Sequence, residues 1–435
     1  MGIFSIWSSA FVVSLATLIA IVSSHPEGLA GILDALGRAT GIVGLLMLLL
    51  AAALSARVPG FDRWFGGLTR LWKTHHRLGA GSLVLLLLHP VLLSLAQAES
   101  GLDAAVQLLF PPLSDWPIWA GWAGLLLMMV FLAPSFSFFG HPDYRRWKLL
   151  HRLAGPAVIF ALMHAWQYGR TLPANVDKWL WTVMAAMAVG AVAWRFVFSR
   201  RIGRLRYRVA RVVAVANNLV ELVLEPAGRR RLEYDAGQFV YMAPFDRELA
   251  AGHGEEHPYT LSSSPDEKNL RIAIKDLGDA SRAIQTIRPG TRVTIEGPYG
   301  RFFPDREADG EHGKQLWIAG GIGITPFLGR ARWISGRQRR CDVRLVYCVQ
   351  DEARARFLEE LNAISETLEG FQVIPHFFYR QGPLDAGFLV THVPDLVERE
   401  AFVCGPPGLN TLAKRLLIGV GVGRKRIHTE EFELL

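Results

Sequence analysis

Four histidines inside long apolar stretches are the residues with the clearest chemical meaning. They form two pairs, His76 with His89 and His151 with His164, at one shared interval (89 − 76 = 13 and 164 − 151 = 13). Each pair opens on the sequence His-Arg-Leu. An ionisable side chain is costly in hydrocarbon, so a histidine there usually serves a function. A single one is more often a helix-packing residue, but two matched pairs predict ligands.

The spacing of these histidines suits two stacked cofactors. Thirteen helical residues rise about 20 Å, which fits inside a hydrocarbon core of roughly 30 Å. Imidazole is a usual axial ligand of haem iron, and two facing helices can each supply one. We therefore predict two haem groups. His76 and His151 would hold the inner one, and His89 and His164 the outer one.

The interval leaves a geometric question open. Thirteen residues of an ideal helix turn about 140° less than four full turns, so the two ligands would not share a face. Either the haems are offset around the helix, or Gly79, Gly81 and the Gly155-Pro156 pair bend it. His75 lies 14 residues before His89 and is the competing inner ligand.

Length and composition divide the chain in two. Its 435 residues predict two or three domains. The first 200 or so residues are dominated by long apolar runs, and the rest reads as a soluble protein. The net charge of +8 is attributed to membrane topology rather than to nucleic-acid binding, because the basic residues cluster in particular loops. Cys341, Cys348 and Cys404 lack metal-ligand spacing and suggest a reducing cytoplasm.

Six apolar segments are long enough to cross a bilayer. They span residues 3–22, 40–56, 76–96, 118–139, 149–168 and 180–198. The first lacks the basic leading region of a signal peptide. Arg and Lys gather in alternate loops, which by the positive-inside rule places both termini and the second half of the chain in the cytoplasm. The expected location is a bacterial inner membrane.

The second half of the chain shows two different patterns of predicted secondary structure. Short alternating strands separated by Gly and Pro predict a small antiparallel barrel up to residue 309. From residue 310 a strand-helix-strand rhythm predicts a doubly wound domain, whose ligands lie at the carboxyl ends of the strands. The glycine-rich turn 320–326 would bring a pyrophosphate to a helix N-terminus. The expected domains are 1–200, 203–309 and 310–435.

These motifs, in this order, resemble a known family. The second half is similar to the ferredoxin–NADP reductase superfamily, and the whole chain resembles the NADPH oxidase and ferric reductase family, in particular its bacterial NADPH oxidase-like members. The resemblance implies a six-helix transmembrane haem-binding bundle, then an antiparallel β-barrel FAD domain, then an α/β NAD(P)H-binding domain.

The resemblance also implies a flavin site. The family's flavin motif corresponds to His257, Pro258, Tyr259 and Thr260, with Ser263 in the same loop. Tyr259 would pack on the flavin and Thr260 would reach the reactive edge of its ring. The segment that binds the FAD phosphates corresponds to Ile274, Lys275, Gly278 and Ser281, with Lys275 as the counter-charge.

The nucleotide site follows from the same likeness. The nicotinamide nucleotide loop corresponds to Gly320, Gly321, Gly323, Thr325 and Pro326, and the segment under the nicotinamide to Cys404, Gly405 and Pro406. Phe432 resembles the aromatic residue that covers the flavin, although three residues follow it. The expected catalytic residues are Thr260, Cys404 and Phe432. Gln350 stands where the family usually carries an Arg for the NADPH 2′-phosphate, so NADH is also possible, and Arg380 is the substitute cation.

The function implied is transmembrane electron transfer. Cytosolic NAD(P)H would reduce FAD, and electrons would pass through two b-type haems to an acceptor on the opposite side. Oxygen, giving superoxide, is the first choice of acceptor, a ferric chelate is the alternative, and a quinone or a partner protein is third. No obligatory protein partner is expected. The rival interpretations are a haem subunit within a larger complex and a soluble-type reductase with a plain anchor.

Overall fold

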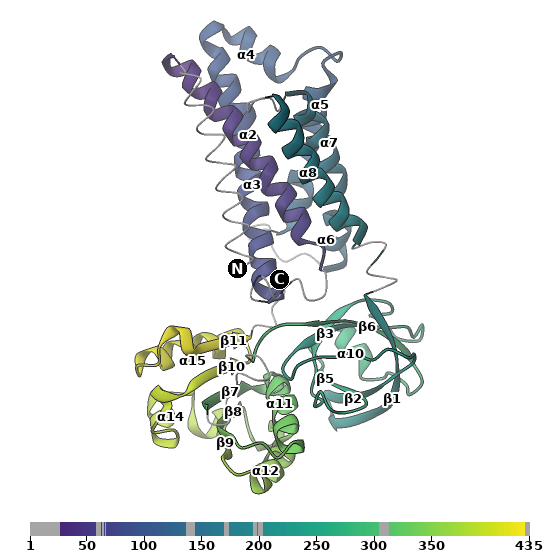
Figure 1. Ribbon diagram of the computed structural model, residues 1–435, viewed down its shortest axis with the longest axis vertical. Helices are drawn as coiled ribbons and strands as arrows, with labels where there is room; N and C mark the ends of the chain where they lie inside the picture. The colour runs from purple at the N-terminus through teal and green to yellow at the C-terminus, as the bar shows by residue number, and fades with distance from the viewer. Residues whose placement is uncertain are drawn as a thin grey trace. The chain divides into compact units, whose positions relative to one another are not determined.

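The computed structural model describes residues 27–57, 62, 65, 67–135, 144–168, 174–194, 198, 203–303 and 313–430. The chain divides into two compact units, one made mainly of residues 1–200 and one mainly of residues 201–435 (Figure 1). The segment 3–22, predicted as the first span, lies outside the described residues.

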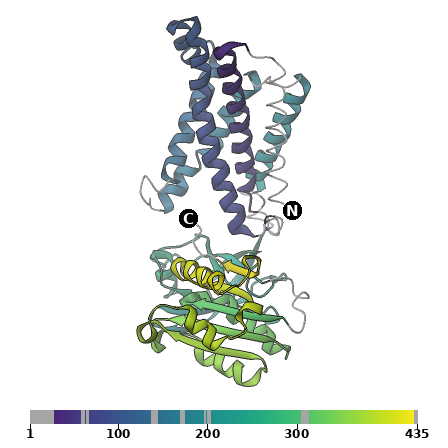
Figure 2. The same ribbon diagram turned by 90° about the vertical axis from the view of Figure 1, so that its left-hand side faces the viewer.

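The first unit is helical. Its long helices are α2 (Gly28–Leu54), α3 (Leu68–Gln97), α5 (Trp116–Leu132), α7 (Ala154–Tyr168) and α8 (Ala174–Ala193), and its short ones are α4 (Leu102–Leu109) and α6 (Tyr144–His151). The long helices run roughly alongside one another in both views (Figures 1 and 2). Four stretches of the described chain are long and apolar enough to cross a membrane: Gly28–Leu54, Leu68–Ser100, Trp116–Ser135 and Arg146–Tyr168. Within α8, the apolar stretch Trp181–Ala191 is shorter.

Two of these helices begin earlier than their apolar runs. The second span was predicted from residue 40, whereas α2 begins at Gly28 and carries the ion pair of Asp34 with Arg38 one turn apart. The third was predicted from residue 76, whereas α3 begins at Leu68. Charged and polar residues continue a helix beyond the apolar stretch that predicts it, so hydropathy alone places the starts too late.

The fifth predicted span is broken rather than continuous. Helix α6 ends at His151 and α7 begins at Ala154. Pro156 has no N–H to donate to the carbonyl of Arg152, and the Gly155 N–H bonds that oxygen instead at 3.3 Å. The break agrees with the alternative in which the Gly155-Pro156 pair bends the helix.

Glycines let α2 approach α3 closely. A Cβ atom on Gly37, Gly41 or Gly44 would lie 2.7 Å, 2.7 Å and 2.9 Å from the side chains of Leu93, His89 and Leu86, respectively. No larger residue fits these positions without displacing its neighbour, and small residues are what membrane helices use for close contact.

The second unit begins with a six-stranded antiparallel sheet. Its strands are β1 (Arg204–Ala216), β2 (Leu219–Pro226), β3 (Phe239–Pro244), β4 (His257–Thr260), β5 (Leu270–Lys275) and β6 (Arg292–Tyr299), in the order β4-β3-β6-β1-β2-β5. A bridge between Leu261 and Ile272 joins the two edges, so the sheet curls on itself. Helix α10 (Asp279–Ile284) follows β5. The antiparallel sheet predicted for this part of the chain is confirmed.

A five-stranded parallel sheet follows. Its strands are β7 (Lys314–Gly320), β8 (Asp342–Val349), β9 (Phe371–Phe377), β10 (Glu400–Cys404) and β11 (Ile427–Glu430), in the order β11-β10-β7-β8-β9. Helices α11 (Thr325–Gly336) and α12 (Leu358–Thr367) cover one face, and α14 (Ala386–His392) and α15 (Pro407–Gly419) the other (Figures 1 and 2). The short helix α13 (Phe378–Gln381) follows β9. The doubly wound α/β domain is therefore confirmed.

The strand order has a direct consequence for ligand binding. The chain proceeds from β7 outward to β8 and β9, then returns to β10 on the other side of β7. Ligands of such sheets lie at the carboxyl ends of the strands where the order reverses. Here those ends are Gly320 and Cys404, so the fold brings together two motifs that lie 84 residues apart (404 − 320 = 84).

Candidate functional site

Two pairs of imidazole rings face one another inside the helical unit. The ring centroids of His89 and His164 are 6.1 Å apart, and those of His75 and His151 are also 6.1 Å apart. If one metal ion lay between two such rings, the separation of their centroids would be two metal–nitrogen bonds of about 2 Å each plus the distance from each ring centroid to its nitrogen. The observed separations agree with that sum. His76, the first choice for the inner pair, has its ring centroid 5.7 Å from that of His75.

Three side chains of α3 are fixed by α2 at a regular interval. His75, Ser82 and His89 are spaced by seven residues (82 − 75 = 7 and 89 − 82 = 7). His75 Nδ1, Ser82 Oγ and His89 Nδ1 lie 2.8, 2.8 and 2.7 Å from the backbone oxygens of Ala51, Gly44 and Gly37, respectively. A carbonyl oxygen only accepts, so both Nδ1 atoms donate, and in a neutral ring Nε2 keeps its lone pair for a metal.

The partner histidines have different surroundings. His164 Nδ1 donates to the Pro117 carbonyl at 2.9 Å, and a Cβ atom on Gly121 would lie 2.9 Å from that nitrogen. His151 stacks on Trp147 at 5.0 Å and meets the Phe131 ring edge-on at 5.3 Å. Its Nδ1 is buried and has no hydrogen-bond partner within the described part of the chain.

This donor set fits haem better than a bare metal ion. In the described segments, no group of three or more His, Cys, Asp or Glu side chains could hold a metal. Facing pairs of imidazoles instead suit an iron that brings its own ring of four further ligands. Gly41 and Gly121 leave room beside His89 and His164, where a Cβ atom would press on the imidazole. The residues present therefore fit two bis-histidine haems.

The flavin motif forms β4 and the turn after it. Tyr259 is partly buried against the barrel core, and this burial raises the pKa of its phenol, so it stays neutral. Thr260 is buried and pairs with Phe239 of β3, while His257 and Pro258 pair with Met242 and Tyr241. The Ser263 hydroxyl is already engaged, since it lies 2.7 Å from the Tyr234 hydroxyl and accepts from Arg271 N at 3.0 Å.

The expected phosphate segment lies at the end of β5. Ile274 is a core residue, and Lys275 follows it as the last residue of the strand. The Ser281 hydroxyl donates to Gly278 O at 3.0 Å and accepts from Leu277 N at 2.8 Å. Helix α10 begins at Asp279 directly after Gly278 and is six residues long. Lys275 is the cation of this segment that could meet the phosphates of FAD.

The glycine-rich turn packs tightly against the segment after β10. A Cβ atom on Gly323 would lie 2.3 Å from the Cys404 carbonyl oxygen, and one on Gly320 would lie 2.4 Å from Leu409. Gly321 differs, because it has φ of +53° and nothing within 4 Å of an added Cβ. Packing therefore requires glycine at positions 320 and 323. At Gly321 the backbone stays accessible, so a ligand could approach it.

The other residues of these two motifs shape the start of each helix. Thr325 Oγ1 donates to Ile322 O at 3.0 Å, and Pro326 stands in the first turn of α11. Cys404 is fully buried at the end of β10. Burial, with the charge of Glu430 adding to it, raises the pKa of the Cys404 thiol well above its ordinary value, so the thiol stays protonated. Gly405 and Pro406 face Gly320. Phe432 lies outside the described residues.

Replacing Gly323 with alanine is expected to destabilise the second unit. The added Cβ would press on backbone rather than on a flexible side chain, and such overpacking costs about 1–3 kcal/mol. Denaturant unfolding followed by tryptophan fluorescence measures the change. Gly336→Ala, also in α11 and with nothing near its added Cβ, is the matched control and should not destabilise the unit. Equal stability of the two variants would contradict the required contact.

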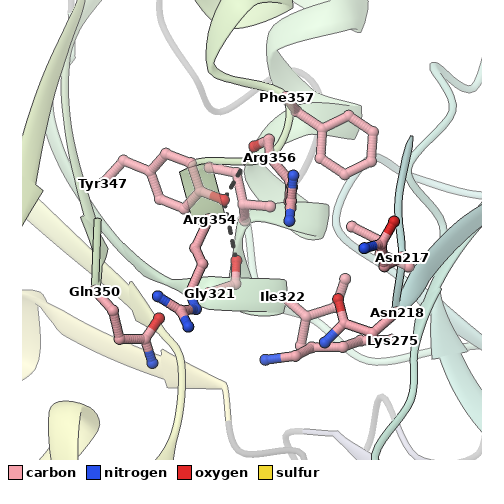
Figure 3. Close-up of a pocket in the computed structure, with 12 residues that line it drawn as sticks. Asn217, Asn218, Lys275, Gly321, Ile322, Tyr347, Gln350, Arg354, Arg356 and Phe357 are labelled. Atoms are coloured by element: carbon pink, nitrogen blue, oxygen red, sulfur yellow. Dashed lines mark hydrogen bonds between the residues drawn. The ribbon is translucent and has the colours of Figure 1, made fainter. Parts of the chain in front are cut away.

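A cavity of about 340 Å³ opens beside the glycine-rich turn (Figure 3). Gln350, Arg354 and Arg356 line it from the segment after β8, and Lys275 lines it from the barrel. Figure 3 shows the Lys275 ammonium pointing toward the side where Gln350 and Arg354 lie. The Tyr347 hydroxyl donates to Arg356 O at 3.0 Å, which holds the segment in place.

The cations of this cavity differ from the one expected. Arg380 is not among the lining residues, and it pairs with Glu352 at 3.6 Å on the surface. Arg354 and Arg356 were missed, although they follow the end of β8 at Val349 by five and seven residues (354 − 349 = 5, 356 − 349 = 7). Their closeness to a strand end was the available signal, because cations there receive a nucleotide 2′-phosphate.

Three protein-family profiles match consecutive parts of the chain. Residues 40–162 match a ferric reductase like transmembrane component, residues 204–302 an FAD-binding domain, and residues 317–415 an oxidoreductase NAD-binding domain. The matched ranges follow the helical unit, the antiparallel sheet and the parallel sheet in turn.

Known relatives match about half of the chain. The chain is 26% identical to an NADPH oxidoreductase of Mycobacterium tuberculosis over 236 residues, which are 52% of this chain and 60% of that protein. It is 31% identical to the glycine betaine monooxygenase reductase subunit of Pseudomonas aeruginosa over 191 residues, 40% of this chain and 50% of that protein. The chain thus spans little more than half the length of these relatives.

A solved structure shares the fold over a longer range. A flavohemoglobin from Malassezia yamatoensis, with bound FAD and heme, aligns with a TM-score of 0.51 at 18% identity over 96% of this chain and 98% of that one. At that identity the likeness concerns the fold alone. Taken together, the three profile matches and the two sheets show that the chain belongs to the ferric reductase and NADPH oxidase-like family and is a membrane oxidoreductase with an FAD- and NAD(P)-binding half of the ferredoxin–NADP reductase type.

Proposed function

We propose that this protein carries electrons across a membrane, from NAD(P)H on one side to an acceptor on the other. The observation that carries the proposal is the double pair of imidazoles at equal 6.1 Å separations, in a chain that also has flavin- and nucleotide-binding domains. A reductase with a plain anchor would have no need of such pairs.

His75 and His151 would hold the inner haem, and His89 and His164 would hold the outer one. His75 and His89 are 14 residues apart on one helix, a rise of about 21 Å. The carbonyls of α2 orient both rings through Nδ1 and leave Nε2 as the nitrogen that would bind an iron. When bound, FAD supplies a carrier that accepts two electrons and releases them singly, and haem supplies a one-electron carrier.

The membrane arrangement has six spans, with both termini and the second half of the chain in the cytoplasm of a bacterium. The basic loops support this orientation. Residues 1–200 form the haem domain, 203–309 the FAD domain and 310–435 the NAD(P)H domain. Followed from the C-terminal domain to the N-terminal one, this is the order in which electrons would pass from NAD(P)H through FAD to the haems.

The chain's own residues hold the dinucleotide. The open backbone at Gly321 and the start of α11 receive its pyrophosphate, and the segment at Cys404 lies under the nicotinamide. Tyr259 and Thr260 contact the flavin. Arg354 and Arg356 receive the 2′-phosphate in place of the family's usual Arg, so NADPH is preferred over NADH.

Oxygen is the preferred acceptor, and superoxide is the product. The loop between α3 and α5, residues 98–115, contains three carboxylates and no Lys or Arg. Its exposed side chains include Leu102, Phe110 and Leu113. An anionic ferric chelate would meet charge repulsion there, whereas oxygen is small and uncharged and needs no such contacts. Ferric-chelate reduction is the alternative.

Purified protein given NADPH should reduce cytochrome c at a rate that superoxide dismutase largely abolishes. The same preparation under argon with ferric citrate measures the alternative directly. Comparison of air and argon separates the two acceptors, and NADH in place of NADPH tests the nucleotide preference. A rate of cytochrome c reduction that dismutase leaves unchanged would refute superoxide as the product.

A further inference from the structure

Helix α11 lies directly against the backbone of residues 261–264, the flavin loop that follows β4. A Cβ atom on Gly329 would come within 2.9 Å of Leu261 O and 3.1 Å of Ser263 O. This helix begins at Thr325, immediately after the glycine-rich turn, and the loop begins immediately after Thr260. The nucleotide turn and the flavin strand are therefore linked through one packing interface, that of α11 with the flavin loop, which is called the seam below.

Arg332 bridges this seam with most of its donors. Its Nε and one terminal nitrogen donate to the two carboxylate oxygens of Glu360, at 2.6 and 2.8 Å. The other terminal nitrogen donates to Glu221 at 3.0 Å and to Ser262 O at 2.8 Å. Ser262 in turn donates its hydroxyl to Glu221 at 2.9 Å. One guanidinium thus joins α11, α12, β2 and the flavin loop.

The centre of the bridge is buried, and its outer carboxylate is not. The side chains of Arg332 and Glu221 are 8% and 6% exposed, and that of Glu360 is 40% exposed. Burial acts to lower the pKa of Arg332, but the hydrogen bonds and charges of Glu360 and Glu221 outweigh it, and the pKa is raised. The guanidinium is permanently charged, and only a planar fork can serve both carboxylates and the carbonyl together.

We infer that Arg332 is a positioning residue, which fixes the distance between the nicotinamide turn and the flavin loop for hydride transfer. This inference rests on the proposed function. Arg332 lies seven residues along α11 from Thr325, a rise of about 10 Å. Because the helix moves as one body, a displacement of Arg332 also displaces the glycine-rich turn at the start of the helix. Misplacing reacting groups by about 1 Å can cost on the order of 100-fold in rate.

The chain supplies a matched control on the same seam. Arg337, just after α11, pairs with Asp266 of the barrel through two hydrogen bonds of 2.5 and 2.7 Å. Both side chains are more than 40% exposed. An exposed pair contributes little, so removing it should leave hydride transfer unchanged.

The test uses the full-length holoprotein under anaerobic conditions, with variants Arg332→Met, Arg332→Lys and Arg337→Met. Stopped-flow absorbance gives the limiting rate of flavin reduction by NADPH and the nicotinamide–flavin charge-transfer band, and titration gives the NADPH Kd. Amide hydrogen exchange over residues 261–264 reports the seam itself, with and without FAD.

For Arg332→Met we expect the rate to fall about 10- to 100-fold and the charge-transfer band to weaken, with the Kd changed less than about threefold. Exchange at 261–264 should rise. Arg332→Lys, which keeps the charge without the fork, should be intermediate, and Arg337→Met should match the unmodified protein.

Two results would overturn the inference. One is an unchanged rate and band in Arg332→Met. The other result concerns Arg332→Lys, and it decides the matter if Arg332→Met loses FAD. If Arg332→Lys retains FAD and its flavin is reduced as fast as that of the unmodified protein, the inference is refuted. Failure of the unmodified holoprotein to be reduced by NADPH would instead refute the proposed function, so the two failures are distinct.

Discussion

Replacing His75 with alanine should remove one of two haems, whereas replacing His76 should leave both in place. The ring of His75 lies 6.1 Å from that of His151 and is oriented by the Ala51 carbonyl through Nδ1, so its Nε2 would be the nitrogen that binds iron. We expect the haem content to fall from about two to about one per chain, since the loss of an axial ligand removes the bond that retains the iron. His89→Ala should have the same effect at the outer position.

A pyridine haemochromogen assay against protein concentration measures this content, and a reduced-minus-oxidised spectrum identifies b-type haem. Flavin reduction by NADPH should persist in His75→Ala, because it depends on the second unit, while reduction of the external acceptor should cease. Full haem content in His75→Ala together with loss of haem in His76→Ala would show that the neighbouring residue is the ligand.

Removing both cavity arginines, Arg354→Ala with Arg356→Ala, should raise the KM for NADPH about 10- to 100-fold. A hydrogen bond to a charged group is worth about 1.5–3 kcal/mol, and exposure reduces this for Arg354, which is 53% exposed and paired with Asp351. The KM for NADH should change little, because NADH has no 2′-phosphate. Steady-state kinetics with both nucleotides measures the shift in preference.

Arg380→Ala is the matched control, since that arginine pairs with Glu352 outside the cavity. Its KM values should stay near those of the unmodified protein. If Arg380→Ala weakened NADPH binding and the double variant did not, the 2′-phosphate would lie on the other side of Gln350, and the cavity would have another occupant.

Much of the site was available from local patterns. Apolar runs indicated the membrane half, and the histidines within them indicated haem. The glycine-rich turn at 320–326 and the segment after Cys404 indicated the nucleotide end of a parallel sheet, where the structure brings them together. The membrane-type helical half and the meeting of the two nucleotide motifs are confirmed, because each depends on residues that are close in sequence and on rules that hold for any strand or helix. The haem ligands stay a prediction.

Other features depended on contacts between distant segments. Whether His75 or His76 faces His151 is decided by α2, whose carbonyls at Ala51, Gly44 and Gly37 match the seven-residue spacing of His75, Ser82 and His89. The sequence contained this repeat, but neighbouring histidines on one helix differ only by about 100° of rotation, which spacing alone does not resolve.

The sequence by itself determined which types of functional residue the chain contains. They are histidines within apolar segments, a flavin-binding strand and a glycine-rich nucleotide turn. Tertiary structure alone decided which ring lies opposite His151, which arginines line the cavity and how Arg332 joins α11 to the flavin loop. The physical reason is that residue type follows from local composition, whereas the direction of a buried polar side chain follows from the partner that satisfies its hydrogen bonds, and that partner comes from elsewhere in the chain.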